Sequence, residues 1–162
     1  IYKNIVVNIE NKDYYEAELL LLKESLDNIC DVIKEIGNGL KPKEQDHSRA
    51  TIANKIHKSE GEIDWATTSN KIRNKFLAFK KWPKVFFKLG GVNVEAVDLQ
   101  LYSNETGNPG EVYGFDQEAL KIYCKDGVVA ITSVKFPGKK VIGSKDFFNS
   151  KRDIISRGDL LI

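Results

Sequence analysis

The first forty residues contain one long amphipathic pattern. Apolar residues between Tyr14 and Ile36 recur at alternating spacings of three and four, which is the period of a helix with a single apolar stripe. Asp13 followed by Glu16 is typical of a capping-box start, and Gly37 and Gly39 are typical of a left-handed helix stop. The stripe comprises Leu19, Leu22, Leu26, Ile29, Ile33 and Ile36.

This stripe suits either packing against a β-sheet or a short coiled coil. We favour the sheet, because the pattern is short and no repeats follow it. The hydrophobic opening Ile1–Val7 predicts a strand that has lost its neighbours. The chain starts with isoleucine and contains no methionine, so we expect a fragment of a longer protein. In such a fragment the stripe should stay exposed or drive association.

The pattern changes twice further along the chain. Residues 39–63 are polar and aperiodic, which predicts a linker. Ile72, Phe76 and Phe79 then fall four and three apart on one face, so a short helix is expected up to Trp82-Pro83.

After Pro83 the hydrophobic period becomes two, with frequent turn signals, and this predicts antiparallel strands. Gly90-Gly91 and Asp126-Gly127 indicate hairpins. The apolar phase slips between Ala96 and Val97, which predicts a bulge that bends the strand. Five strands preceded by a helix favour an oligonucleotide/oligosaccharide-binding (OB) type barrel, with a sandwich as the open alternative. The strands are Val85–Leu89, Val92–Leu101, Glu111–Phe115, Leu120–Cys124 and Val128–Phe136, followed by a helical turn at Ser144–Asn149.

The net charge of +2 hides an uneven distribution. Residues 1–64 hold 9 basic and 13 acidic side chains, whereas residues 65–162 hold 16 and 10. Between Lys71 and Lys88 seven cations occur without an acidic residue, which suits a phosphate backbone better than an ordinary solvated face. These cations are Lys71, Arg73, Lys75, Lys80, Lys81, Lys84 and Lys88.

Candidate catalytic chemistry is sparse. The only histidines, His47 and His57, lie in the polar linker without a nucleophile pattern. Cys30 and Cys124 lack metal-ligand spacing, so buried free thiols are expected and no metal site is predicted. The aromatic residues could stack on bases, but in a small domain most are expected to fill the core. No segment predicts a membrane span or signal peptide, so we expect a cytoplasmic protein.

Several motifs resemble, in order and spacing, the linker and C-terminal domain of the methionyl-tRNA formyltransferases. The opening Tyr2-Lys3 and the first helix resemble the end of that family's catalytic domain. One departure is Lys84-Val85, where the family usually has glycine and a small residue. The motifs are Ala50–Ile56, Glu60–Trp65, Ile72–Asn74, Phe79–Pro83, Asn108–Val112, Cys124–Gly127, Gly138–Lys140 and Asp146–Phe148.

The resemblance implies an α+β fold in three parts. Residues 1–38 would be the terminal strand and helix of a Rossmann-like formyltransferase domain, 39–63 a linker, and 64–162 an OB-like tRNA-binding barrel. The family transfers a formyl group from 10-formyltetrahydrofolate to methionyl initiator tRNA with an Asn, His and Asp trio. That trio has no counterpart in this sequence, so neither catalytic residues nor a bound cofactor are expected here.

The resemblance, together with the charge excess, implies that this portion contacts initiator methionyl-tRNA and that its parent is a monomer. The expected phosphate contacts are Lys55, Lys58, Arg73, Lys75, Lys80, Lys81 and Lys139. Two alternatives stay open: a free-standing RNA-binding module that shares the barrel, and a related folate-dependent protein, either a formyltransferase for a nucleotide sugar or a formyltetrahydrofolate hydrolase domain. The basic stretch favours a tRNA substrate.

Overall fold

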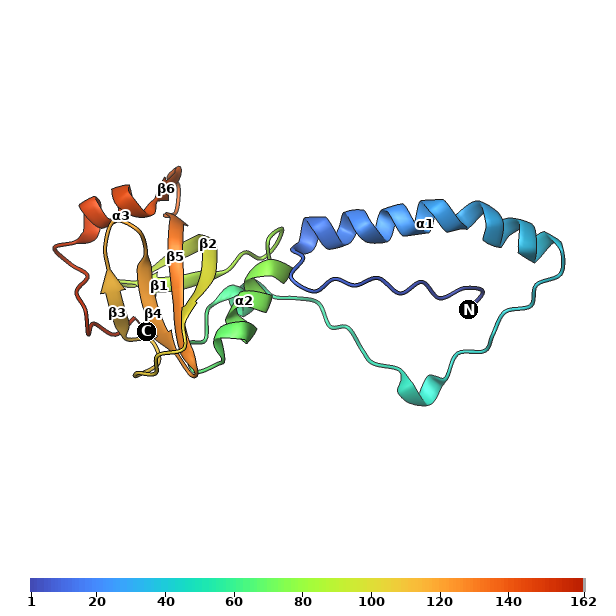
Figure 1. Cartoon of the computed structure of the whole chain (residues 1–162), viewed down its shortest axis with the longest axis horizontal. Helices are drawn as coiled ribbons and strands as arrows, with labels where there is room; N and C mark the ends of the chain where they lie inside the picture. The colour runs from blue at the N-terminus through green and yellow to red at the C-terminus, as the bar shows by residue number, and fades with distance from the viewer. Residues whose placement is uncertain (162) are drawn as a thin grey trace. The chain divides into compact units, whose positions relative to one another are not determined.

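The computed structural model describes residues 1–161, which form two compact units. The first comprises Ile1–Ile56 and the second begins at His57. Figure 1 shows the long helix of the first unit and the curved sheet of the second.

The first unit contains the predicted amphipathic helix, α1, which runs from Tyr14 to Gly37. The capping box is confirmed, because the Asp13 carboxylate accepts from the Glu16 N–H at 3.0 Å and the Glu16 carboxylate accepts from the Asp13 N–H at 2.9 Å. Beyond the helix Gly39 has a φ of 95°, the left-handed conformation that the sequence predicted for the stop.

The prediction of a strand at Ile1–Val7 is wrong. This segment is extended but belongs to no strand among the described residues. It is held at single points, where the Ile1 amino group donates to the Lys43 carbonyl at 2.7 Å and Lys3 Nζ donates to Asn28 Oδ1 at 2.6 Å. A strand needs a continuous hydrogen-bonding neighbour, and residues 1–56 supply none.

The apolar stripe of α1 is exposed. Leu19 is 68% exposed, Leu26 64% and Ile33 60%. Cys30 is also exposed, so the expectation of a buried thiol is wrong there, whereas Cys124 is buried and free as expected. Cys30 follows Ile29 of the stripe, on a helix that has no buried residue.

The linker ends by joining the second unit's sheet. It contains two short 3-10 helices, η1 (His47–Arg49) and η2 (Lys58–Gly61). Just after η2, the Ile63 N–H donates to the Phe86 carbonyl at 2.8 Å, and Glu62 forms a parallel bridge with Phe86. The end of the predicted linker is therefore part of the folded unit.

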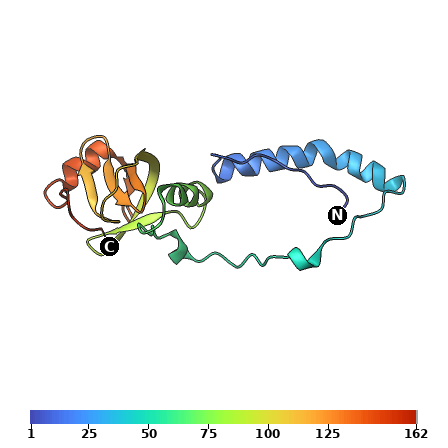
Figure 2. The ribbon, with the colours of Figure 1, turned by 60° about the horizontal axis from the view of Figure 1, so that its bottom comes forward.

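The sheet of the second unit is antiparallel and has six strands, one more than predicted. The missed strand, β6, is only three residues long and pairs with the end of β5, so its periodicity is too short to detect. The spatial order is β1-β2-β5-β4-β3, and Figure 2 shows how these strands curve. The strands are β1 (Phe86–Leu89), β2 (Val92–Ser103), β3 (Val112–Phe115), β4 (Leu120–Cys124), β5 (Gly127–Lys135) and β6 (Val141–Gly143).

The turn signals locate both predicted hairpins. Gly90 and Gly91 have φ values of 55° and 77°, which suits the tight turn between β1 and β2. Cys124 pairs with Gly127, so the second turn is Lys125-Asp126, one residue earlier than expected. The predicted bulge in β2 is confirmed, because the register with β5 shifts between Ala96 and Asp98.

Two helices complete the second unit. α2 (Ser69–Ala78) packs on β2 and β5, and α3 (Ser144–Lys151) packs on β5 and β6. The prediction that most aromatic residues fill the core holds for Trp65, Phe87 and Phe147, whereas Trp82 is 51% exposed. The largest fully buried side chains include Phe87, Phe147, Leu120, Ile122, Ile131, Val85, Val94 and Val134.

We expect Gly61→Ala to destabilise the second unit by about 1–3 kcal/mol, the usual cost of overpacking. An added Cβ would lie 2.2 Å from the backbone carbonyl oxygen of Lys84, which cannot move without breaking the turn. Gly114→Ala is the matched control, because its Cβ would meet nothing within 4 Å. Urea unfolding monitored by tryptophan fluorescence would compare the two variants, and equal midpoints would contradict the expectation.

A peptide of residues 1–40 is expected to associate or precipitate, because its stripe is exposed. Sedimentation velocity across a concentration series measures this. Replacing Leu22 and Ile29 by glutamate in the same peptide should restore a monomer. A wild-type peptide that stays monomeric and soluble would refute the role assigned to the stripe.

Candidate nucleic-acid interface

The position of α2, which carries the first basic residues, is set by the β4–β5 turn. The Ser69 N–H donates to the Asp126 carboxylate at 2.7 Å, and the Lys125 N–H donates to the Thr67 carbonyl at 3.1 Å. The hydrogen bond from Ser69 holds the pKa of Asp126 below its usual value, although desolvation opposes this. Because a carboxylate is favourable at a helix N-terminus, the turn both anchors α2 and orients it.

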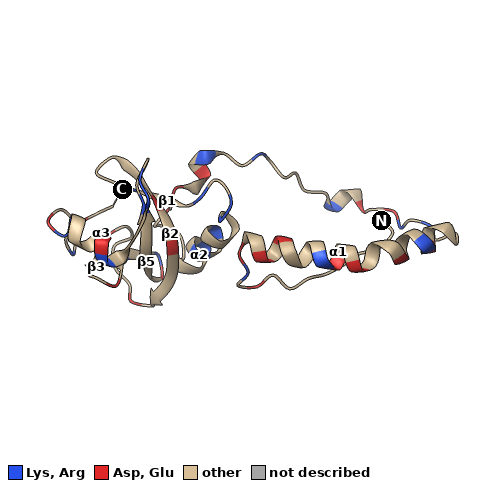
Figure 3. Cartoon of the chain, turned by 90° about the horizontal axis from the view of Figure 1, so that it is seen from above, with Lys and Arg blue, Asp and Glu red and all other residues tan. Residues whose placement is uncertain are grey.

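The apolar side of α2 determines where its cations project. Ile72 is 2% exposed and Phe76 5%, and both face the core. Lys71 is exposed, while Arg73 and Lys75 are half-buried. Figure 3 shows Lys and Arg on α2 and in the loop that follows it, whereas α1 carries both signs of charge.

Part of the basic run is tied into the fold rather than freely solvated. Lys75 Nζ donates to the Glu62 carbonyl at 3.0 Å, and Lys80 Nζ donates to the Val97 carbonyl at 3.3 Å. Lys88 Nζ lies 2.8 Å from the Glu62 carboxylate. The basic segment contains no acidic residue in sequence, but the fold brings an anion from the linker against it. Lys75 and Lys88 therefore both hold the linker's end in place.

Lys84 stands where the resemblance implies a glycine, and its backbone adopts a conformation that favours glycine. Its φ is 73°, in the left-handed region that favours glycine. Its ammonium group donates to the Lys80 carbonyl. The side chain is thus placed at this turn despite an unfavourable backbone conformation.

A cleft of about 240 Å³ lies next to this turn. Lys58 and Lys84 come together there from two different segments, and Lys135 completes the set of cations. Gly138 also lines the cleft, so the exposed Lys139 lies at its edge. The cleft is lined by Lys58, Pro83, Lys84, Phe86, Asn93, Glu95, Lys135, Phe136, Pro137 and Gly138.

The seven residues expected to contact phosphate therefore occupy different settings. Lys58 lines the cleft and Lys139 adjoins it, whereas Lys75 and Lys80 donate to backbone carbonyls near α2. Arg73 is half-buried on α2 and Lys81 is exposed just beyond it, while Lys55 belongs to the first unit.

Lys84 and Lys135, which line the cleft, were not among the expected contact residues. Lys84 is nevertheless one of the seven cations that the sequence singles out between Lys71 and Lys88. Lys135 lies outside that basic segment, and a single lysine at the end of a strand is common on any sheet, so the sequence alone does not single it out.

A cluster of tyrosines on the sheet was also missed. The rings of Tyr102 and Tyr113 are 5.9 Å apart, and those of Tyr113 and Tyr123 are 5.3 Å apart. The Tyr113 hydroxyl donates to Glu105 at 3.1 Å, and this hydrogen bond raises the pKa of Tyr113. A Cβ added at Gly107 would lie 2.7 Å from the Tyr123 ring. The cluster thus anchors the β2–β3 loop, while Tyr102 stays 48% exposed.

Lys121 is a cation with a structural role. Its Nζ lies 2.7 Å from the Asp116 carboxylate and 4.8 Å from the Tyr102 ring centre, and the residue is only 7% exposed. The hydrogen bond to Asp116 raises the pKa of Lys121 against the effect of burial. Desolvation acts to raise the pKa of Asp116, but hydrogen bonds from Lys121 and backbone N–H groups keep it below its usual value.

Other site chemistry is lacking in the part of the chain that the structure describes. Residues 1–161 contain no cluster of three metal-ligating side chains, and none of their helices is long and apolar enough to cross a membrane. His47 and His57 are both exposed. The His57 N–H donates to the Glu60 carboxylate at 2.6 Å, which begins η2.

The sequence profile of the family described as "Formyl transferase, C-terminal domain" matches residues 55–152. The chain belongs to this family. The match begins at Lys55 and includes all seven expected contact residues, the cleft and the β4–β5 turn.

Curated relatives of this formyl transferase C-terminal domain are named methionyl-tRNA formyltransferases. The relative from Finegoldia magna is 37% identical over 66% of this chain and 35% of its own length. That from Pseudomonas entomophila is 33% identical over 72% of this chain and 37% of its own. The chain thus spans little more than a third of the length of these relatives.

Solved structures share the fold of this formyl transferase chain. HypX from Aquifex aeolicus in complex with tetrahydrofolic acid superposes with a TM-score of 0.56 and 20% identity, covering 84% of this chain and 26% of HypX. A multiply substituted variant of HypX gives a TM-score of 0.57 at 21% identity, over 81% of this chain and 24% of its own. At this identity the likeness concerns the fold alone.

We expect Asp126→Ala to lower the melting temperature at neutral pH, because α2 loses the carboxylate at its N-terminus. Since the folded pKa of Asp126 is lowered, its contribution is present above the ordinary carboxyl pKa and is lost as pH falls through the folded value. The difference in melting temperature between Asp126→Ala and wild type should therefore become smaller at acid pH. Thermal melts between neutral and acid pH measure it, with the exposed Asp153→Ala as control. A difference that does not depend on pH would contradict this account.

Proposed function

We propose that this chain is the C-terminal portion of a methionyl-tRNA formyltransferase, and that it binds initiator methionyl-tRNA for translation initiation in the cytoplasm. The observation that carries the proposal is the basic surface of the second unit, which falls inside the region matched by the family. The names of the relatives support tRNA as the substrate of the parent protein.

The proposed role of each cation in RNA binding follows from its exposure and its hydrogen bonds. Lys58, Lys81 and Lys139 are exposed on the second unit and would contact phosphates directly. Lys75 and Lys80 donate to backbone carbonyls with one of three ammonium hydrogens, so they retain donors for phosphate. Lys55 and Arg73 would extend the contacts to the linker and to α2.

Formyl transfer in the parent is proposed to use residues outside this portion. The two histidines of the chain are exposed and lie at the two 3-10 helices, His47 in η1 and His57 directly before η2. The one-carbon donor, 10-formyltetrahydrofolate, would bind to the parent and not to this portion. The bound tetrahydrofolic acid of HypX belongs to that protein.

The domain assignment is part of the same proposal. Residues 1–38 would be the end of a Rossmann-like formyltransferase domain, 39–63 a linker whose last residues, from His57, join the second unit, and 64–162 an OB-like barrel. The exposed stripe of α1 supports the first assignment, because such a helix requires an apolar partner. The curved antiparallel sheet between two helices supports the last.

Binding to formylatable initiator tRNA should weaken strongly as the salt concentration rises. The slope of the logarithm of the association constant against the logarithm of the salt concentration reports the number of phosphate contacts. Lys81→Gln combined with Lys139→Gln should reduce that slope by about two, roughly one for each phosphate contact. Fluorescence anisotropy of labelled tRNA at a series of salt concentrations provides the measurement.

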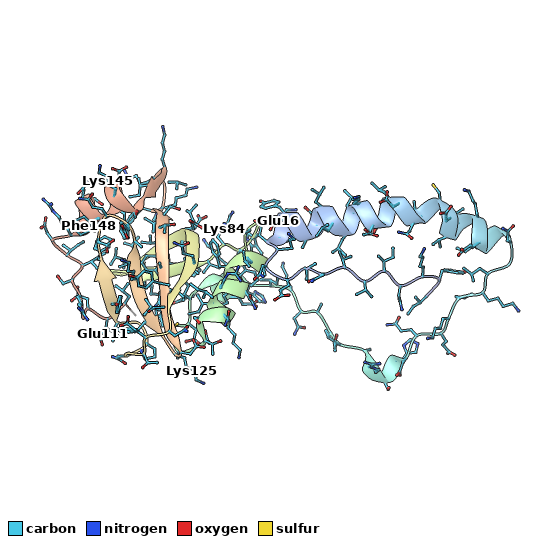
Figure 4. All side chains as sticks on the ribbon, viewed as in Figure 1. Glu16, Lys84, Glu111, Lys125, Lys145 and Phe148 are labelled. Atoms are coloured by element: carbon cyan, nitrogen blue, oxygen red, sulfur yellow. The ribbon has the colours of Figure 1, made fainter. Side chains whose placement is uncertain are left out.

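The matched control replaces Lys125 and Lys145 by glutamine, which removes the same charge from two other exposed positions of the second unit, labelled in Figure 4. The salt-dependence slope of this control should change little from that of wild type. If wild type fails to bind the tRNA, or if both double variants lose the same slope, RNA binding by this basic surface is refuted.

A further inference from the structure

The cleft beside Lys84 is built from segments that lie far apart in the sequence. Phe86 of β1 pairs with Glu95 of β2, and Glu95 pairs with Lys135 of β5, so these three residues form one row across three strands. Direct cross-strand neighbours have Cβ atoms about 5 Å apart, so the row presents a continuous surface. Lys58 of η2 and the turn at Lys84 enclose one side of it.

The charge of this cleft favours an anion. Three lysines line it against a single carboxylate, that of Glu95. Within residues 1–161 the ammonium groups of Lys58 and Lys135 form no hydrogen bond or ion pair, and Glu95 forms no ion pair. The Lys84 ammonium group donates one hydrogen to the Lys80 carbonyl and keeps two others. The cations are therefore not neutralised by the fold, and a phosphate between them would be stabilised.

The remaining walls suit a flat apolar group of small size. Phe86, Phe136 and Pro137 contribute aromatic and apolar surface. The volume of 240 Å³ lies just below the range of about 300–1,000 Å³ typical of drug-sized ligands, so the cleft has room for one nucleotide at most. The Glu95 carboxylate can only accept hydrogen bonds when ionised, and an exocyclic amino group of a base can supply them.

The backbone of Lys84 adds an independent argument. A lysine in the left-handed conformation costs roughly 1–2 kcal/mol, and such strain concentrates where a side chain has a function. The strained residue here is also a cation that lines the cleft. Glycine would form the same turn without strain but would leave the cleft one cation short.

We propose that this cleft binds one unpaired nucleotide of the RNA, with its phosphate between Lys58, Lys84 and Lys135 and its base against Phe136 and Pro137. The inference rests on the proposed RNA-binding function and adds a defined subsite to it. Lys84 is then a residue on which the affinity of this subsite depends.

The test compares Lys84→Gly and Lys84→Ala in the whole 162-residue chain. Both variants remove the ammonium group, but only alanine keeps a Cβ in the strained conformation, so Lys84→Ala should melt at a lower temperature than Lys84→Gly. Both should nevertheless lose about tenfold in affinity for a labelled single-stranded RNA dodecamer and for initiator tRNA. Lys125→Ala, which removes an exposed charge at the β4–β5 turn, should bind as wild type does.

A duplex RNA of the same length is the second probe, because paired bases cannot enter the cleft. The inference requires that affinity for the duplex changes less than twofold in both Lys84 variants. Equal losses for single-stranded and duplex RNA would overturn the nucleotide subsite and leave a general phosphate contact. Wild-type affinity of both variants for every probe would overturn the subsite while leaving the proposed function intact, whereas failure of wild type to bind any RNA would overturn both.

Discussion

The second unit depends on the burial of β5. Val128, Val129, Ile131 and Val134 of this strand are fully buried, so both of its faces are covered. β2 pairs along one edge, β4 and β6 pair along the other, and α2 and α3 pack against it. Each fully buried Val or Ile side chain contributes about 1.5–3 kcal/mol relative to exposure. The other elements are thus arranged around one strand, and the cationic surface takes its position from it.

The packing of the second unit also determines where its charged side chains lie. α2 commits Ile72 and Phe76 to the core, which leaves its cations on the remaining faces. The linker end then enters the sheet edge, where Gly61 lets the Lys84 carbonyl approach closely. Lys75 and Lys88 both reach the neighbouring Glu62. A few short contacts therefore connect the linker, the basic helix and the cleft into one surface suited to a polyanion.

The first unit obeys a different constraint. α1 satisfies its own backbone hydrogen bonds and begins with a complete capping box, so local interactions suffice to define it as a helix. Its apolar stripe has no partner within residues 1–56. Helices gain most of their stability from the packing of such a face. The first unit therefore requires an apolar partner surface, whereas the cations of the second unit favour binding of an anion.

Local patterns in the sequence determined α1 and its cap, α2, the Gly90-Gly91 hairpin and the bulge near Ala96, because each depends on residues close together in the chain. The charge imbalance and the family resemblance likewise required no coordinates. Long-range contacts decided the rest. The opening segment failed to become a strand for lack of a neighbour, β6 exists through its pairing with β5, and Glu62 meets Lys88 only after the chain has folded. The cleft brings Lys58, Lys84 and Lys135 together from three segments. This arrangement depends on strand register and on the turn at Lys84, so the hydrophobic periodicity of the sequence could not predict it.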